Sequence, residues 1–434
     1  MKQQLNDFDP AVRAAALETY LTAARETTRA EFGLVNLHAH TFFSYNAEGY
    51  SPTGFAVAAH ERGLNAAGIV DFDVLDGLDE FLHASRQLNL RGCVGIESRV
   101  FVPELAPFEI NSPGEPGIAY HMGVGFTTTR LDPESLAFLA EMRATAEQRN
   151  RELIARVNAY LDPVQLDFAR DVAPLTPAGN ATERHICHAY ARRAADHFQG
   201  DAAALAAFWS AKCGPEAAAL DLPSGPKLQA LVRAKTMKRG GVGYVQPAAG
   251  SFPTQAAMNR FILAAGAIPT IAWLDGGSAG EQQLDTLLDV ALATGVAAIA
   301  LIPFRNYDPK QPDARRERLY QLVETARRRA LPLFIGTEMN SPGLPFVDDI
   351  ECEALAPLAE DFRAGAYLAY AHTVLQHRAG LGLLSPWAQQ HFLEPVARNE
   401  FYSRLGQALT PATEDRLGDL NADLAPDEVL RRLR

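Results

Sequence analysis

The stretch Asn36-Leu37-His38-Ala39-His40-Thr41-Phe42-Phe43-Ser44 decides how this chain is interpreted. It follows the apolar run Phe32-Gly33-Leu34-Val35, which is typical of a strand. Residues i and i+2 of an extended backbone point to the same side, so His38 and His40 can bind one metal ion from a strand end. The alternative is a pair of ordinary histidines at a loop start. Ligand-type residues after later apolar runs favour the metal site.

Short apolar runs recur along the chain and are mostly separated by amphipathic segments such as 53–63 and 77–90. The seven main runs are 33–38, 66–71, 93–101, 118–126, 268–274, 297–304 and 331–337. Consecutive parallel strands joined by helical crossovers form an open doubly wound sheet or a closed barrel, and both place their chemistry at the carboxyl ends of the strands. The barrel is favoured, because ligand-type residues end nearly every run.

The helical patterns divide the chain around this barrel. A capped helix is expected from Asp9 to Arg29, and Gly241–Val245 is a candidate short strand. The predicted parts are an N-terminal helical extension at 1–32, a barrel at 33–130 and 236–375, a helical insertion at 131–235, and a C-terminal helical tail at 376–434. We expect the insertion to cover the carboxyl-end mouth of the barrel and to restrict it to small substrates.

Composition limits the partners of the protein. The 434 residues are 47% hydrophobic and carry a formal net charge of -12, which argues against binding to nucleic acid or to an anionic membrane. A local patch can still hold a small anion. The four cysteines form no Cys-x-x-Cys pair, and no stretch resembles a signal peptide or a membrane span, so a reduced, cytoplasmic location is expected. A homo-oligomer is one alternative for its assembly.

Carboxylates and imidazoles follow the apolar runs. The predicted metal ligands are His38, His40, Asp71, Glu97, His121, Asp275 and Glu338. This mixture suits zinc, manganese or iron, with one or two ions and positions left open to water. The alternative role for Asp71 or Asp73 is that of a helix N-cap. The alternative role for Asp275 is that of a turn residue, since Gly276-Gly277 follows it.

Cationic and histidine side chains supply candidates for substrate binding. Arg305 and Arg99 follow or end strands and can contact an anion, with a surface ion pair as the alternative role. His185 and His188 share one helical face in the insertion and can line a pocket, although an exposed polar stripe is the more common meaning of such a pair. We assign Asp73 and Arg305 as the candidate catalytic residues.

The sequence resembles the PHP (polymerase and histidinol phosphatase) domain superfamily over roughly 33–130 and 240–345. The opening motif of that family is His-x-His-(Ser/Thr), a small polar turn and a Pro, and here His38–Thr41 leads through a polar turn to Pro52. Glu97 and His121 match later family motifs, and Ala265-Gly266-Ala267 matches a helix-to-strand joint. The resemblance implies an α/β fold, a distorted (β/α)7 TIM-like barrel that binds up to three metals and, in many members, hydrolyses phosphate esters.

Three imidazoles of the family pattern are replaced in this chain. Val70-Asp71-Phe72 stands where Thr-Asp-His is usual, and Ala272-Trp273-Leu274 stands where Ala-His-Pro is usual. Glu338-Met339-Asn340 replaces the final Asp-x-His. Carboxylates lie near two of the three positions, which indicates a remodelled, oxygen-rich site for one or two ions.

These features predict a metal-dependent hydrolase, foremost a phosphoesterase for a small phosphorylated metabolite. Two alternatives remain open. One is hydrolysis of a C–N bond by an amidohydrolase-type site, and the other is a non-catalytic PHP-like protein that binds a metal or ligand.

Overall fold

The computed structural model describes residues 1–24, 31–247, 250–307 and 313–433. Positions 25–29 of the expected N-terminal helix and Arg434 of the predicted tail therefore lie outside the described residues. The chain forms two compact units. Unit 1 comprises Met1–Thr41, Asn46–Phe138 and Phe252–Arg434, and unit 2 comprises Phe42–Tyr45 and Leu139–Ser251.

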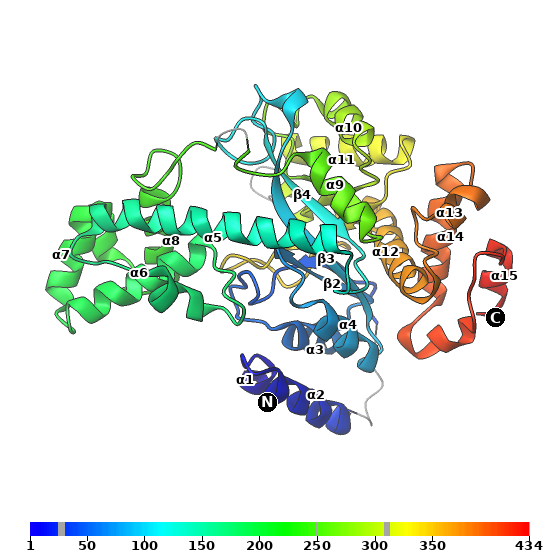
Figure 1. Cartoon of the computed structure of the whole chain (residues 1–434), viewed down its shortest axis with the longest axis horizontal. Helices are drawn as coiled ribbons and strands as arrows, with labels where there is room; N and C mark the ends of the chain where they lie inside the picture. The colour runs from blue at the N-terminus through cyan, green and yellow to red at the C-terminus, as the bar shows by residue number, and fades with distance from the viewer. Residues whose placement is uncertain (25–30, 248–249, 308–312, 434) are drawn as a thin grey trace. The chain divides into compact units, whose positions relative to one another are not determined.

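Unit 1 is built around one seven-stranded sheet whose strands are hydrogen-bonded in chain order, β1 to β7. Figure 1 shows β2, β3 and β4 of this sheet. The strands are β1 (Val35–Ala39), β2 (Ala66–Phe72), β3 (Arg91–Phe101), β4 (Ile118–Val124), β5 (Ile268–Trp273), β6 (Ala298–Leu301) and β7 (Leu333–Ile335). Nearly every strand residue is buried, as expected for a sheet covered on both faces. The seven apolar runs of the sequence correspond to these seven strands.

One strand runs against the expected direction. β4 pairs antiparallel with both β3 and β5, whereas the other pairs are parallel. The expectation of parallel strands throughout is therefore wrong at β4. The connection at 102–117 contains only the short helix η1 (Pro103–Leu105) and no crossover helix, so the chain returns beside β3.

The sheet closes on itself between β1 and the residues that follow β7. Ala39 and Glu338 form an isolated parallel bridge. The Glu338 N–H donates to the His38 carbonyl at 2.7 Å, and the His40 N–H donates to the Glu338 carbonyl at 2.8 Å. This joint, which we call the seam, makes the sheet a seven-stranded α/β barrel, as the sequence predicts.

Helices surround the barrel. Those between or beside the strands are α3 (Pro52–Glu61), α4 (Leu78–Gln87), α9 (Gln255–Ala264), α10 (Leu284–Ala293) and α11 (Asp313–Arg328). α3 begins where the Ser51 side chain accepts from the Gly54 N–H and Pro52 occupies the first turn. Before β1 lie α1 (Lys2–Leu5) and α2 (Pro10–Ala24), and the Asp9 carboxylate accepts the Ala11 N–H at 2.8 Å.

The helix α12 (Ala359–Ala379) packs against the amino-terminal ends of several strands. Arg363 donates to the Gly33 carbonyl just before β1, and Thr373 contacts Cys93 near the start of β3. Gly365 lies so close to β7 that a Cβ there would be 1.8 Å from the Leu333 carbonyl oxygen. α14 (Pro395–Ala408) packs on the other side of α12, and the short helices α13 (Pro386–His391) and α15 (Pro426–Arg431) lie in the tail.

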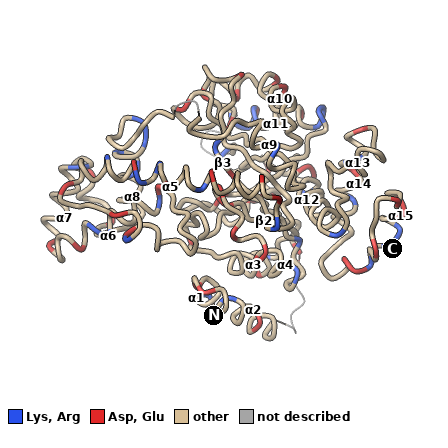
Figure 2. The backbone as a smooth tube through the Cα atoms, in the orientation of Figure 1, with Lys and Arg blue, Asp and Glu red and all other residues tan. Residues whose placement is uncertain are grey.

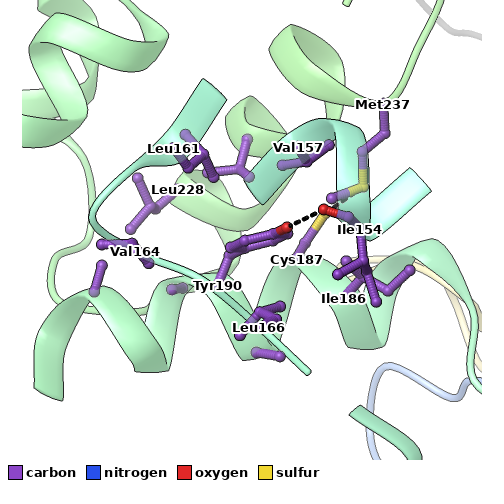
Figure 3. Packing of buried hydrophobic residues seen from close by; sticks show 14 of the residues in the cluster. Ile154, Val157, Leu161, Val164, Leu166, Ile186, Cys187, Tyr190, Leu228 and Met237 are labelled. Atoms are coloured by element: carbon purple, nitrogen blue, oxygen red, sulfur yellow. Dashed lines mark hydrogen bonds between the residues drawn. The ribbon is translucent and has the colours of Figure 1, made fainter. Parts of the chain in front are cut away.

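Unit 2 is helical and has its own core (Figure 3). Its helices are the larger part of α5 (Pro133–Leu161), then α6 (Glu183–His197), α7 (Ala202–Cys213) and α8 (Pro226–Thr236). At the centre, the buried Tyr190 hydroxyl donates to Asn158 at 2.8 Å and to the Ile154 carbonyl at 3.2 Å. The expected strand at Gly241–Val245 is absent, and these residues form turns instead.

None of the helices in the described part of the chain is both long and apolar enough to cross a membrane. Acidic and basic residues are interspersed over both units (Figure 2).

The contact between α12 and β7 makes a stability prediction. Gly365→Ala should destabilise the protein by about 1–3 kcal/mol, because the new methyl group cannot fit against the Leu333 carbonyl without moving the helix. The change in the free energy of unfolding is measured by urea unfolding of the whole protein, monitored by circular dichroism. Gly343→Ala is the control: a Cβ there meets nothing within 4 Å, and only the positive φ of 85° opposes it. Equal effects of the two substitutions would contradict the packing described.

Candidate metal centre

Two strands bring three ligand-type side chains together. His38 lies in β1, His40 follows its last residue, and Glu97 lies in β3, level with the last residue of β2. One ligand atom from each lies within 4.8 Å of the others, and all three residues are buried. Glu97 Oε2 is 3.4 Å from His38 Nε2 and 3.2 Å from His40 Nε2. The predicted His-x-His pair thus faces a single carboxylate across the barrel interior.

The donor atoms at this point fit a divalent cation. His38 Nε2 and Glu97 Oε2 are buried, and beyond their 3.4 Å contact with each other and the His40 contact, no described residue forms a hydrogen bond with either atom. Burying such atoms is costly unless something satisfies them. Two imidazoles and one carboxylate form a three-ligand set that is found in catalytic zinc sites, where the fourth position is left to water or substrate. The residues present therefore suit one ion of the zinc, manganese or iron type.

Burial and charge act in opposite directions on this cluster. Burial alone disfavours the charged form of His40, but the carboxylates of Glu97, Asp71 and Glu338 outweigh it and raise the His40 pKa above its ordinary value. Burial likewise disfavours the charged form of Glu97, and the two histidines lower its pKa below the ordinary value. Glu97 is therefore an ionised carboxylate at neutral pH, as a metal ligand must be.

An apolar ring and a glycine shape the cluster. Phe72 stacks on His40, with ring centroids 4.3 Å apart. It stands on the same face as Glu97, its register partner. A Cβ on Gly336 would lie 2.4 Å from the His38 nitrogen, so only glycine allows β7 to approach β1 here.

Asp71 supports the centre without joining it. In the β2–β3 register Asp71 stands beside Ile96, so it lies on the face opposite to Glu97. One carboxylate oxygen accepts the Thr41 N–H at 2.8 Å and the other accepts the Thr41 hydroxyl at 2.6 Å. Asp71 is not among the three residues whose ligand atoms converge. Asp71 instead anchors the residue that directly follows His40.

At Asp73, directly after β2, the backbone turns away from the extended strand conformation. Its φ of 59° is left-handed, its N–H donates to the Glu97 carbonyl at 2.9 Å, and its carboxylate accepts the Ser98 hydroxyl. A non-glycine residue in this region is uncommon. The residue predicted as catalytic is therefore tied to the backbone of a candidate ligand.

Glu338 and Arg305 form an ion pair beside the cluster. Arg305, in the short helix η5 (Pro303–Asn306) after β6, donates from Nη2 to Glu338 Oε2 at 2.8 Å. Asn340 donates to the same oxygen at 3.2 Å. Glu338 is thus close to His40 but is held by an arginine, and it is not among the three ligand atoms that converge.

His121 faces away from the centre. Its register partner on β3 is Ser98, whereas Glu97 pairs with Met122, and neighbouring residues of a strand point to opposite faces. The ring Nε2 lies 2.6 Å from Asn259 Oδ1 of α9. Burial lowers its pKa to about 4, and the Asn259 hydrogen bond only partly offsets this effect. The structure does not bring this predicted ligand to the cluster, because the register of β4 on β3 puts the ring on the face opposite to Glu97.

Asp275 occupies a turn, which was the alternative to metal binding. Its carboxylate accepts the Gly277 N–H at 2.9 Å and lies 3.8 Å from the Arg315 guanidinium. The buried Glu281 organises this loop by accepting N–H groups from Leu274, Asp275 and Gly276. Burial nevertheless raises the pKa of Glu281 to about 7.

The other predicted substrate contacts are already engaged. Arg99 pairs with Glu115 at 2.9 Å and lies over the Phe252 ring. In unit 2, His185 Nδ1 accepts the Thr182 N–H and closes the capping box of α6. Burial lowers the pKa of His185 to about 3, so it is neutral at physiological pH and cannot attract an anion by charge. His188 lies 3.4 Å from Gln229 and is only partly buried.

The sequence interpretation did not identify Thr41, Phe72 and Glu281 as parts of the site and its surroundings. Thr41 and Phe72 were visible as motif positions, because one follows His-x-His and the other replaces an imidazole. No sequence signal marked Glu281, since its partners are backbone N–H groups of a loop.

No family model matches the sequence, and neither does any curated protein. Several chains of solved structures are similar to it, among them the following two. One is an amidohydrolase from Chromobacterium violaceum with bound sulfate and no metal, at 19% identity and TM-score 0.49, covering 74% of this chain and 96% of its own. The other is a proposed metal-dependent phosphoesterase from Bifidobacterium adolescentis, at 18% identity and TM-score 0.48, covering 76% and 96%. These values are too low to transfer an activity.

The cluster predicts which substitution removes bound metal. His38→Ala should lose the ion, because it deletes one of three converging ligands, whereas His121→Gln should keep it, because that side chain faces Asn259. Elemental analysis after equilibration with zinc or manganese and removal of the excess measures both. Metal loss in both variants, or in neither, would contradict the assigned ligand set.

Proposed function

We propose that this protein is a metal-dependent hydrolase. The observation that carries the proposal is the buried convergence of His38, His40 and Glu97 at the carboxyl ends of barrel strands. A barrel of this kind places its active site at that edge. The His-x-His-Thr motif, the seven-stranded barrel and Glu97 on β3 also support membership of the PHP superfamily as a divergent chain.

The proposed cofactor is one divalent ion of zinc, manganese or iron, held by the three residues of the cluster. When bound, the ion would act as a Lewis acid and bring the pKa of water toward neutrality. Three neighbouring residues position or shield the ligand His40. Asp71 and Thr41 fix the chain beside His40, and Phe72 keeps one side of the imidazole apolar. Outer contacts of this kind orient ligands in metal sites.

Asp73 is the proposed proton acceptor. The Ser98 hydroxyl and the Glu97 carbonyl hold it at the end of β2, next to the strand that carries Glu97. To take a proton from an attacking water, this carboxylate would have to turn from Ser98, the residue after Glu97 on β3, toward the cluster.

The proposed substrate is a small anionic metabolite, foremost a phosphate monoester. Arg305 is partly exposed, and its Nη2 bonds to Glu338. Within the described part of the chain its other N–H groups bond to nothing, so they can contact a substrate oxygen. The net charge of -12 disfavours a long polyanion such as nucleic acid. A single phosphate or carboxylate needs only a local cation.

Hydrolysis of a C–N bond is the second candidate. The observation that favours it is the ligand set itself, because two histidines and one glutamate also hold the zinc of metallopeptidases. A non-catalytic metal-binding protein would need the same cluster but not an oriented Asp73.

A substrate panel separates these functions. Protein loaded with zinc or manganese should hydrolyse small phosphate monoesters, and His38→Ala should lower kcat/KM by more than about 100-fold, because changes to outer contacts alone cost about 10–100-fold. Initial rates on matched phosphomonoester and amide panels measure the activity. Arg329→Ala is a control that removes a positive charge paired with Asp285 and Asp289 on α10.

Activity confined to the amides would assign the protein to the second candidate. Activity in neither panel, with metal bound, would leave the non-catalytic alternative. Phosphatase activity that survives in His38→Ala would place the chemistry elsewhere in the chain.

A further inference from the structure

Glu338, like Asp71, is a predicted ligand that comes near the cluster and still lies outside it. The seam fixes its backbone, because its N–H and carbonyl bond to the main chain of His38 and His40. Both Glu338 and Met339 have left-handed φ values, of 60° and 54°. Such backbones persist only where their surroundings enforce them, so the position of the Glu338 side chain is set by the closure of the barrel.

The carboxylate of Glu338 is engaged on one side. Oε2 accepts from Arg305 at 2.8 Å and from Asn340 at 3.2 Å. No described residue donates a hydrogen bond to Oε1. The Glu338 side chain is 10% exposed and that of Arg305 is 37% exposed, so the pair lies between the buried cluster and solvent. An ion pair at such a boundary keeps more of its Coulomb attraction than one at the open surface.

The charges at the centre argue against a further ion at Glu338. His38, His40 and Glu97 contribute one negative charge toward a divalent cation. Arg305 already neutralises Glu338, and a second cation placed on that carboxylate would meet the guanidinium as a like charge.

We propose that Arg305 holds Glu338 out of the metal-ligand set, so that the chain binds one ion and the guanidinium takes the place of a second cation. This inference rests on the proposed metal centre and concerns the number of ions and the affinity. Arg305 and Asn340 are then positioning residues for Glu338. Removing Arg305 frees a carboxylate next to His40, which a metal ion can recruit.

The test measures metal affinity and not activity. Zinc and manganese are titrated into metal-free protein in competition with a chromophoric chelator, and the bound ions are counted. Wild-type protein should bind one ion. Arg305→Ala and Arg305→Met should bind the ion about 10-fold more tightly, or should bind a second ion. A tenfold change in affinity is about what the loss of one charge-assisted hydrogen bond to Glu338 would produce. The methionine keeps the apolar stem if alanine impairs folding.

A double variant identifies the carboxylate responsible. Glu338→Gln alone should leave the wild-type affinity nearly unchanged, because Glu338 is not a ligand while Arg305 is present. Arg305→Ala combined with Glu338→Gln should return to the wild-type value. Arg329→Ala, which removes the same charge from unit 1 but pairs with α10, is the matched control and should change neither affinity nor stoichiometry.

The outcomes separate this inference from the proposed function. One ion in the wild type, with unchanged or weaker binding after loss of Arg305, overturns the inference and leaves the metal centre intact. Two ions in the wild type overturn it as well. An equal gain in metal affinity or in bound ions in Arg329→Ala would mean that net charge causes the effect, and it would overturn the specific role of Arg305. No metal in the wild type overturns both proposals.

Discussion

The hydrogen bonds of the seam are the constraint on which the candidate centre depends. They join the main chain of His38 and His40 to Glu338 and close the sheet between its first and last strands. Closure is possible because Gly336 has no side chain where β7 meets β1. Without this joint, the two imidazoles and the Glu338–Arg305 pair would not lie at one edge of the same barrel.

The centre combines three buried ligands with neighbouring side chains that limit how many further ligands a metal ion can recruit. Phe72 closes one side of His40 with an apolar ring, and Arg305 occupies the carboxylate on the side of the seam. Asp71 lies close enough to affect His40 but turns its oxygens to Thr41. Several carboxylates therefore surround the imidazoles, yet only Glu97 points at both of them. This arrangement favours a small centre over an extended one.

The order of the strands could be predicted from the sequence, but one strand direction could not. The seven apolar runs correspond to the seven strands, because burial on both faces leaves continuous apolar stretches. The direction of β4 depends on the connection at 102–117, whose lack of a crossover helix was not recognised. His121 was misplaced for a separate reason, because the register of β4 on β3 decides which face its ring occupies.

The sequence by itself indicated the barrel class and the paired histidines, because strand periodicity alone puts His38 and His40 on one face. Glu97 was a candidate from its place in a later apolar run and from the PHP resemblance, and its meeting with the two histidines depends on how the strands pair. Only the tertiary structure decided how Asp71, Asp275 and Glu338 are used. Each is a carboxylate after a strand, and each has a different partner: Thr41, the Gly277 N–H or Arg305. These partners come from other strands and loops, so their distances depend on how the barrel closes and not on local spacing.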